Sequence, residues 1–165
     1  MKVRFTLNGR PCTWEVQPDE TLLDALREHG VTSVKRGCEE GVCGACTVLV
    51  DGKRLNSCLL LAGQIQDRSV LTVEGLGTVQ SPHPIQEAFV KAGAVQCGYC
   101  TPGMVLATKA LLDEKPDPSD RDIKTALDGN LCRCTGYVKI LDAVKLAAQL
   151  IRTSDERDEQ DGGVA

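Results

Sequence analysis

Alternation of polar and apolar residues dominates the first half of the chain. The segments KVRFTL and RPCTWEV both alternate, and Asn8-Gly9 between them is the strongest short signal for a β-hairpin. A second hairpin is predicted where TVLV and KRLNS flank Asp51-Gly52, and a last strand is predicted in SVLTVE. Between the hairpins, Thr21 opens a helical segment, LLDALREHG, in a variant of the capping box. Two hairpins around one helix predict an α+β domain of the β-grasp type over residues 1–75.

The hydrophobic period changes to a helical one after a linker at residues 76–84, which is rich in Gly, Pro and Ser. Four amphipathic segments follow within residues 85–152, and short joins between them predict an all-α four-helix bundle. Thr101 and Pro102 are expected to be the N-cap and first residue of the second of these helices. The last helix carries one apolar stripe: Tyr137, Ile140, Leu141, Val144, Ala147, Ala148 and Ile151.

The formal net charge of −4 has a local origin. Residues 153–165 hold five acids and one base, so the rest of the chain, with 18 of each, is neutral. This acidic tail has few apolar residues and is expected to be disordered. The chain has no basic stripe, which argues against a nucleic-acid partner. It also has no apolar run of about 18 residues and no signal peptide, so no membrane contact and a cytoplasmic location are expected.

Nine cysteines in a reducing compartment favour metal ligands over disulfides. In the first half the spacing is Cys38-x4-Cys43-x2-Cys46, with Cys58 after eleven further residues. This is the plant-type ligand pattern for a 2Fe–2S cluster. Interleaved glycines at 37, 41 and 44 are expected to adopt positive φ and to let backbone N–H groups approach cluster sulfur. A zinc knot is the alternative for this half, although this spacing is unusual for zinc.

In the second half, QCGYCTPG supplies Cys97 and Cys100, and GNLCRCTG supplies Cys132 and Cys134. Both pairs are expected at helix ends that face one another, where they would form a second four-thiolate site. Cys100 precedes a predicted helix N-terminus, which favours the thiolate and predicts a lowered pKa. Cys132 and Cys134 are separated by one residue and are expected to bind the same iron. A zinc site with four cysteine ligands and a thioredoxin-like dithiol at Cys97 and Cys100 are the alternatives.

The ninth cysteine, Cys12, lies on one face of a predicted strand with Trp14 and Val16. It is interpreted as a small buried core residue. The two histidines, His29 and His83, belong to no catalytic constellation, and the chain has no G-x-G-x-x-G dinucleotide fingerprint.

Three motifs in this order, GCEEGVCGACTV, QCGYCTPGM and NLCRCTGY, resemble the small iron–sulfur subunit of the molybdenum hydroxylases, the xanthine dehydrogenase family. The resemblance spans roughly residues 2–150 and includes all eight expected ligand cysteines. It implies one 2Fe–2S cluster in the β-grasp domain and a second in the helical domain. It also implies that Gln96 hydrogen-bonds a molybdopterin and that Cys134 lies near the same pterin.

The resemblance further implies a role in electron transfer. Single electrons would pass from a molybdopterin site on a large partner subunit through the two clusters to FAD on a medium subunit, in a heterotrimer or a dimer of heterotrimers. The loop GCEEGVCGAC favours a purine such as xanthine or hypoxanthine as the substrate of the complex. Other N-heterocycles, aldehydes, carbon monoxide and aromatic thioesters are the alternatives. A free-standing ferredoxin and a zinc-stabilised interaction module are alternatives of other kinds.

Overall fold

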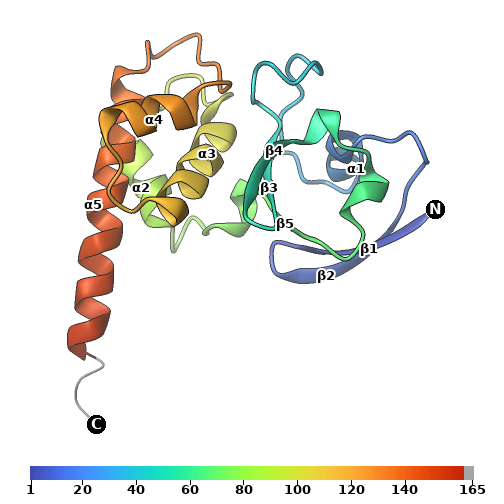
Figure 1. Cartoon of the computed structure of the whole chain (residues 1–165), viewed down its shortest axis with the longest axis horizontal. Coiled ribbons are helices and arrows are strands. Elements are labelled where there is room, and N and C mark those ends of the chain that lie inside the picture. The colour runs from blue at the N-terminus through green and yellow to red at the C-terminus, as the bar shows by residue number, and fades with distance from the viewer. Residues whose placement is uncertain (162–165) are drawn as a thin grey trace.

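The computed structural model describes the backbone of residues 1–161 and the side chains of residues 1–154. A ferredoxin-like half and a helical half lie side by side, with α3 nearest the sheet (Figure 1). The strands are β1 (Lys2–Leu7), β2 (Arg10–Glu15), β3 (Thr47–Val50), β4 (Lys53–Asn56) and β5 (Ser69–Leu71). The α-helices are α1 (Leu22–Glu28), α2 (Pro84–Lys91), α3 (Thr101–Glu114), α4 (Asp120–Leu127) and α5 (Val138–Asp161).

The five strands form one mixed sheet in the order β2-β1-β5-β3-β4. Both predicted hairpins are present, and Asn8 and Asp51 adopt positive φ at the first turn position, as a type I′ turn requires. β5 pairs parallel with β1 and antiparallel with β3, so it joins the two hairpins into one sheet. The last strand is shorter than SVLTVE, because Val73–Gly75 forms a 3₁₀ turn.

One helix covers the core of this half. Thr21 caps α1 as predicted, since its hydroxyl accepts the N–H of Asp24 at 3.1 Å. The helix buries Leu22, Leu23, Ala25 and Leu26 against the strands. Their partners on the strands include Val3, Phe5, Val48, Val50 and Val70. Cys12 faces this core but is only half-buried.

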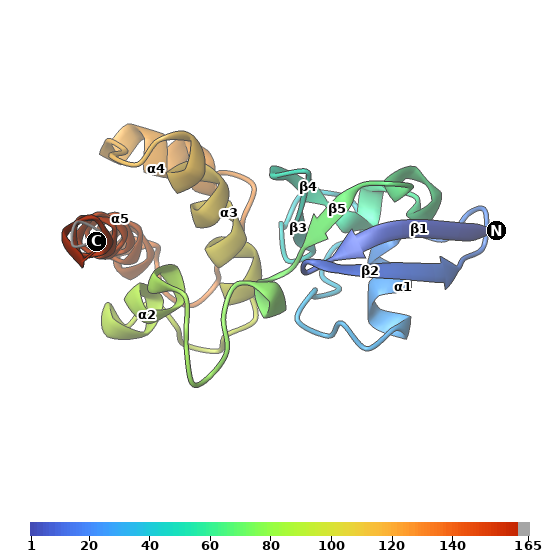
Figure 2. The ribbon, with the colours of Figure 1, turned by 90° about the horizontal axis from the view of Figure 1, so that it is seen from below.

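The helical half consists of α2, α3, α4 and α5 around a second core (Figure 2). α2 packs on α5, and α3 packs on α2 and α4. The predicted stripe of α5 is confirmed, with Ile140, Val144, Ala147 and Ala148 buried. His83 caps α2, because its side chain accepts the N–H of Ile85 at 3.2 Å. No helix among residues 1–161 is both long enough and apolar enough to cross a membrane.

Two predicted boundaries differ from the structure. The N-cap of α3 is Cys100 rather than Thr101, which is already helical. The helix α5 continues to Asp161, so the prediction that residues 153–161 are disordered is wrong. Once a helix is nucleated, each further residue adds a hydrogen bond, and Glu, Gln and Arg are good helix formers. The remainder of the predicted tail, residues 162–165, lies outside the described residues.

The two halves meet closely because two glycines lack side chains. Gly103 is buried in the first turn of α3, and a Cβ there would collide with the carbonyl oxygen of Gly44. A Cβ on Gly44 would in turn collide with the carbonyl oxygen of Gly129. α3 therefore contacts β3 and β4 as well as the neighbouring helices.

Replacing Gly103 with Ala is expected to destabilise the protein by about 1–3 kcal/mol, because the added methyl group overpacks the junction. At an ordinary position inside a helix, replacing glycine with alanine stabilises the protein by about 1 kcal/mol. Destabilisation by Gly103→Ala would therefore show that the added methyl group meets the other domain. Gly63→Ala is the control, since only the flexible end of Met1 lies within 3.4 Å of the new methyl group. Urea unfolding measures both variants. A Gly103→Ala protein that is more stable than the parent would contradict the close approach.

Candidate functional site: two sets of paired thiols

The first set of thiols lies where the hairpin of β3 and β4 meets the loop at residues 37–46. Thr47 pairs with Asn56 across this hairpin, so the residues just outside the pair are neighbours. As a result, the Sγ atoms of Cys46 and Cys58 lie 3.4 Å apart, and both residues are buried. Ser57 holds this end closed, because its hydroxyl donates to the carbonyl of Cys46 at 2.8 Å.

The loop itself presents the half-buried Cys38 and Cys43. Gly41 and Gly44 adopt the predicted positive φ, but Gly37 does not. Gly37 is required for space instead, since a Cβ there would lie 2.6 Å from the Sγ of Cys43. A third positive φ in this loop falls on Glu39, where no glycine or asparagine predicts it. Asn56 steadies the loop by donating to the carbonyl of Gly41 at 2.7 Å.

Backbone donors point at the loop thiols. The N–H of Glu40 donates to the Sγ of Cys38 at 3.4 Å and is the main reason that the pKa of this thiol falls to about 6. Burial, with the neighbouring Cys46, raises the pKa of Cys58 to about 11. N–H groups that stabilise a thiolate also stabilise the sulfur of a bound iron–sulfur cluster.

The second set of thiols comes from the loop before α3 and the loop between α4 and α5. The Sγ atoms of Cys97 and Cys134 lie 3.5 Å apart and both residues are exposed. Cys100 and Cys132, both half-buried, are hydrogen-bonded neighbours. The two loops therefore face each other as predicted, but each close pair takes one thiol from each loop. The expectation that Cys132 and Cys134 bind one iron does not match this pairing.

The thiols of this second set differ in acidity. The backbone N–H of Tyr99 lowers the pKa of Cys97, whereas the hydrogen bond from Cys134 to Cys97 raises the pKa of Cys134. Burial by itself would raise the pKa of Cys132. The pKa is lowered instead, because the hydroxyl and the N–H of Thr135 lie 3.1 and 3.5 Å from its Sγ and stabilise the thiolate.

The prediction for Cys100 is wrong. Burial raises its pKa to about 12, and the hydrogen bond with Cys132 adds to the rise. Cys100 is itself the N-cap of α3, with helical φ and ψ, and its side chain makes no capping hydrogen bond. The helix terminus therefore does not overcome the loss of solvent around this thiol.

The paired arrangement fits a binuclear cluster. When two thiolates bind one tetrahedral metal with metal–sulfur bonds of about 2.3 Å, their sulfur atoms lie about 4 Å apart. The sulfur–sulfur separations of 3.4 Å for Cys46 and Cys58 and 3.5 Å for Cys97 and Cys134 are close to this spacing. Within the described residues, no three Cys, His, Asp or Glu side chains converge on a point for a single ion. Two separate pairs are what two irons bridged by inorganic sulfide require.

Comparison with known proteins agrees with this geometry. Residues 5–72 match the family model of a 2Fe-2S iron-sulfur cluster binding domain, and residues 72–145 match that of a [2Fe-2S] binding domain. The nicotinate dehydrogenase small FeS subunit of Eubacterium barkeri is 51% identical over 148 residues, which cover 89% of this chain and 94% of that protein. The chain belongs to the small 2Fe–2S subunits of the molybdenum hydroxylase family.

Two further relatives of the small 2Fe–2S subunit support the assignment. The xanthine dehydrogenase iron-sulfur-binding subunit of Escherichia coli O157:H7 is 46% identical, with 86% of this chain and 91% of that protein covered. The crystal structure of quinoline 2-oxidoreductase from Pseudomonas putida 86 has a chain that superposes with a TM-score of 0.89 and is 44% identical. That match covers 93% of this chain and 96% of the other. The protein is therefore an iron–sulfur component of a multi-subunit oxidoreductase.

Several residues of the small 2Fe–2S subunit that sequence reasoning missed join the two sets of thiols. The N–H of Leu131 donates to the carbonyl of Cys43 at 2.9 Å, and Tyr99 donates its hydroxyl proton to the carbonyl of Arg36. Leu131 and Tyr99 stand inside the cysteine motifs, but no local pattern shows that they reach across the chain. Tyr137 acts within one set, because it accepts the N–H of Cys132 at 2.9 Å and so fixes the turn at this cysteine.

Alkylation of the metal-free, folded protein at pH 7 is expected to modify Cys38 and Cys97 before Cys58 and Cys100. The thiolate is the reactive form, and it predominates above pH 6 at Cys38 but only near pH 11 to 12 at Cys58 and Cys100. As the pH is raised, Cys58 and Cys100 should therefore be the last of the four to react. Peptide mass spectrometry after a timed iodoacetamide pulse measures the order, and circular dichroism checks that the protein is folded. Equal rates at all four thiols would refute the assigned donors and burial.

Proposed function

We propose that this subunit passes single electrons from a molybdopterin site on a large partner subunit to FAD on a medium partner subunit. The cluster in the helical half would be held by Cys97, Cys100, Cys132 and Cys134. The cluster in the ferredoxin-like half would be held by Cys38, Cys43, Cys46 and Cys58. The observation that carries the proposal is the backbone hydrogen bond of 2.9 Å from the N–H of Leu131, which precedes Cys132, to the carbonyl of Cys43, because it makes the two ligand segments neighbours.

The clusters supply one-electron chemistry when bound, and the chain supplies their surroundings. Backbone N–H groups of Glu40, Tyr99 and Thr135 aim at the thiols and are suited to stabilise a reduced cluster. Cys46 and Cys58 are buried, which limits access of water to one side of the first site. In this proposal the β-grasp domain spans residues 1–75, and a four-helix bundle spans residues 85–152 after a linker at residues 76–84.

The exposed end of the second site is the proposed contact with the molybdopterin subunit. Cys97 and Cys134 are both exposed, and Gln96, which precedes Cys97, is exposed as well. The apolar side chains of Val95 and Tyr99, each two residues from Cys97 in sequence, are also exposed. Such a surface suits burial in an assembled complex, in which Gln96 would hydrogen-bond the pterin. We place the protein in a heterotrimer, single or doubled, in the cytoplasm.

The proposed substrate of the complex is an aromatic N-heterocycle. The purine predicted from the sequence remains one candidate, and the relatives include subunits named for xanthine dehydrogenase and nicotinate dehydrogenase. The choice between purine and pyridine rests on the large subunit, because none of the described pockets of this chain combines catalytic side chains.

The purified subunit is expected to contain about four irons and about four acid-labile sulfides, and to give two distinct EPR signals after reduction. Cys132→Ser should remove or alter one signal, because it changes one ligand of the helical site alone. Cys12→Ser is the control, since Cys12 packs on the core 26 positions before the first proposed ligand. Zinc in place of iron, or loss of both signals in a folded Cys132→Ser protein, would overturn the proposal of two separate clusters.

The complex purified through this subunit is expected to oxidise an N-heterocycle. Xanthine, hypoxanthine and nicotinate are the substrates to compare, with an aldehyde as the control of another class. Reduction of an artificial electron acceptor measures turnover. Oxidation of the aldehyde alone would refute the proposed substrate class but not the electron-transfer role.

A further inference from the structure

One amide, that of Asn130, connects the two domains at their closest approach. Asn130 lies two residues before Cys132, and its side chain is buried, with the residue only 3% exposed. Its Nδ2 donates to the carbonyl of Gly44 at 3.0 Å and to the hydroxyl of Thr47 at 3.2 Å. Both acceptors belong to the ferredoxin-like half, more than 80 residues away in sequence. The amide thus connects the segment that carries Cys132 and Cys134 to the loop that carries Cys43 and Cys46.

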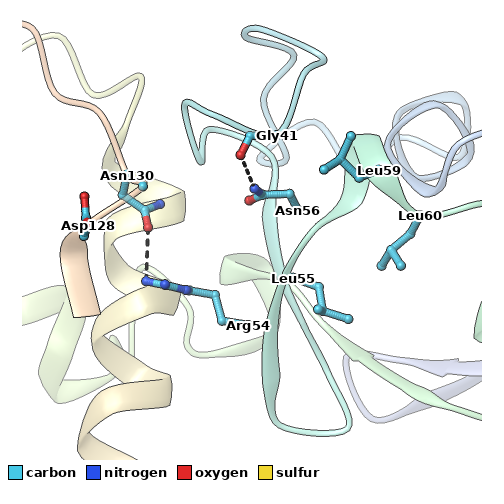
Figure 3. Close-up of a pocket in the computed structure, with 9 residues that line it drawn as sticks. Gly41, Arg54, Leu55, Asn56, Leu59, Leu60, Asp128 and Asn130 are labelled. Carbon is cyan, nitrogen blue, oxygen red and sulfur yellow. Dashed lines mark hydrogen bonds between the residues drawn. The ribbon is translucent and has the colours of Figure 1, made fainter. Parts of the chain in front are cut away.

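Arg54 braces this amide from the outside. Its guanidinium donates to the Oδ1 of Asn130 at 3.5 Å and to the carbonyl of Ala126 at the end of α4. Figure 3 shows Arg54 reaching from β4 across a cleft of about 330 Å³ toward Asn130. All the polar atoms of the Asn130 side chain are therefore engaged with the other half of the molecule, which fixes its orientation.

The bonds of Asn130 lie next to cluster ligands on both sides. Gly44 stands between Cys43 and Cys46, and Leu131 and Cys132 follow Asn130 directly. Next to the Asn130–Gly44 hydrogen bond, the N–H of Leu131 donates to the carbonyl of Cys43. A shift of Asn130 would therefore move a ligand segment of one site relative to a ligand segment of the other. Gly44 and Gly103 have no side chains to maintain the spacing, so the hydrogen bonds must do so.

We propose that Asn130 is a positioning residue that sets the separation of the two clusters and thereby the rate of electron transfer between them. The inference rests on the proposed function. In this step one electron leaves the helical-domain cluster and enters the ferredoxin-domain cluster, and no bond in the chain forms or breaks. Asn130 acts through the two ligand segments and does not itself touch a cluster.

Asn130→Leu tests the inference in the assembled holoprotein. Leucine is similar in size to asparagine, removes the three hydrogen bonds and adds no charge that would shift a reduction potential directly. The variant is expected to keep its iron and sulfide but to lose or narrow the magnetic splitting between the two reduced clusters in low-temperature EPR. Freeze-quench EPR should show slower electron transfer between the clusters. The expected loss is severalfold, because electron transfer between two sites slows as the distance between them grows.

Asn56→Leu is the matched control. Asn56 also donates its amide to a carbonyl of the first ligand loop, that of Gly41 at 2.7 Å, but both partners lie in one domain (Figure 3). This variant should change the line shape of the ferredoxin-domain cluster and reduce the splitting and the transfer rate less than Asn130→Leu does. Equal loss of splitting in both variants would show a general effect of loop disturbance and would overturn the role of Asn130.

Arg54→Met keeps the inference testable if Asn130→Leu does not assemble its clusters. Arg54 is exposed, so its replacement is expected to leave the fold intact. This variant removes the brace on Oδ1, so a smaller change in splitting and rate is expected in the same direction. Parental splitting and rate in every loaded variant would overturn the inference. Absence of two iron–sulfur signals in the parent would instead overturn the proposed function.

Discussion

The presentation of thiols in close pairs is the constraint on which the rest of this structure depends. Two irons bridged by sulfide need two ligands each, and a single loop supplies them only in part. In the ferredoxin-like half, the register of a β-hairpin brings Cys46 and Cys58 to 3.4 Å. In the helical half, two loops at helix ends face each other, so Cys97 and Cys134 meet at 3.5 Å. The secondary structure serves mainly to bring these segments together.

Protons must leave these thiols before metal can bind. In the pair of Cys97 and Cys134, one thiol donates to the other, and the pKa values of the two move apart. Burial holds Cys58 and Cys100 protonated in the metal-free chain. Metal binding to these sites is therefore coupled to proton release, and the backbone N–H of Glu40 lowers the pKa of the half-buried Cys38 to about 6.

The second constraint is the close packing of the two domains at glycines beside their ligand loops. Gly44 and Gly103 allow backbone to approach backbone, and Asn130 and Leu131 supply the hydrogen bonds across the gap. A polar interface of this kind is directional, because buried donors and acceptors must be matched. It fixes the separation of the two sites more narrowly than an apolar contact would.

The sequence by itself determined the elements and the chemistry of this protein. Alternation around Asn8-Gly9 and Asp51-Gly52 predicted both hairpins, the stripe containing Ile140 and Val144 predicted the buried face of α5, and cysteine spacing predicted two sets of ligands. These features follow from local periodicity and turn geometry. Only the tertiary structure decided which thiols are neighbours, why burial raises the pKa of Cys100, and how Asn130 and Arg54 connect the halves. Those outcomes depend on solvent exclusion and on contacts between residues 12 to 86 positions apart, for which a single sequence carries no local signal.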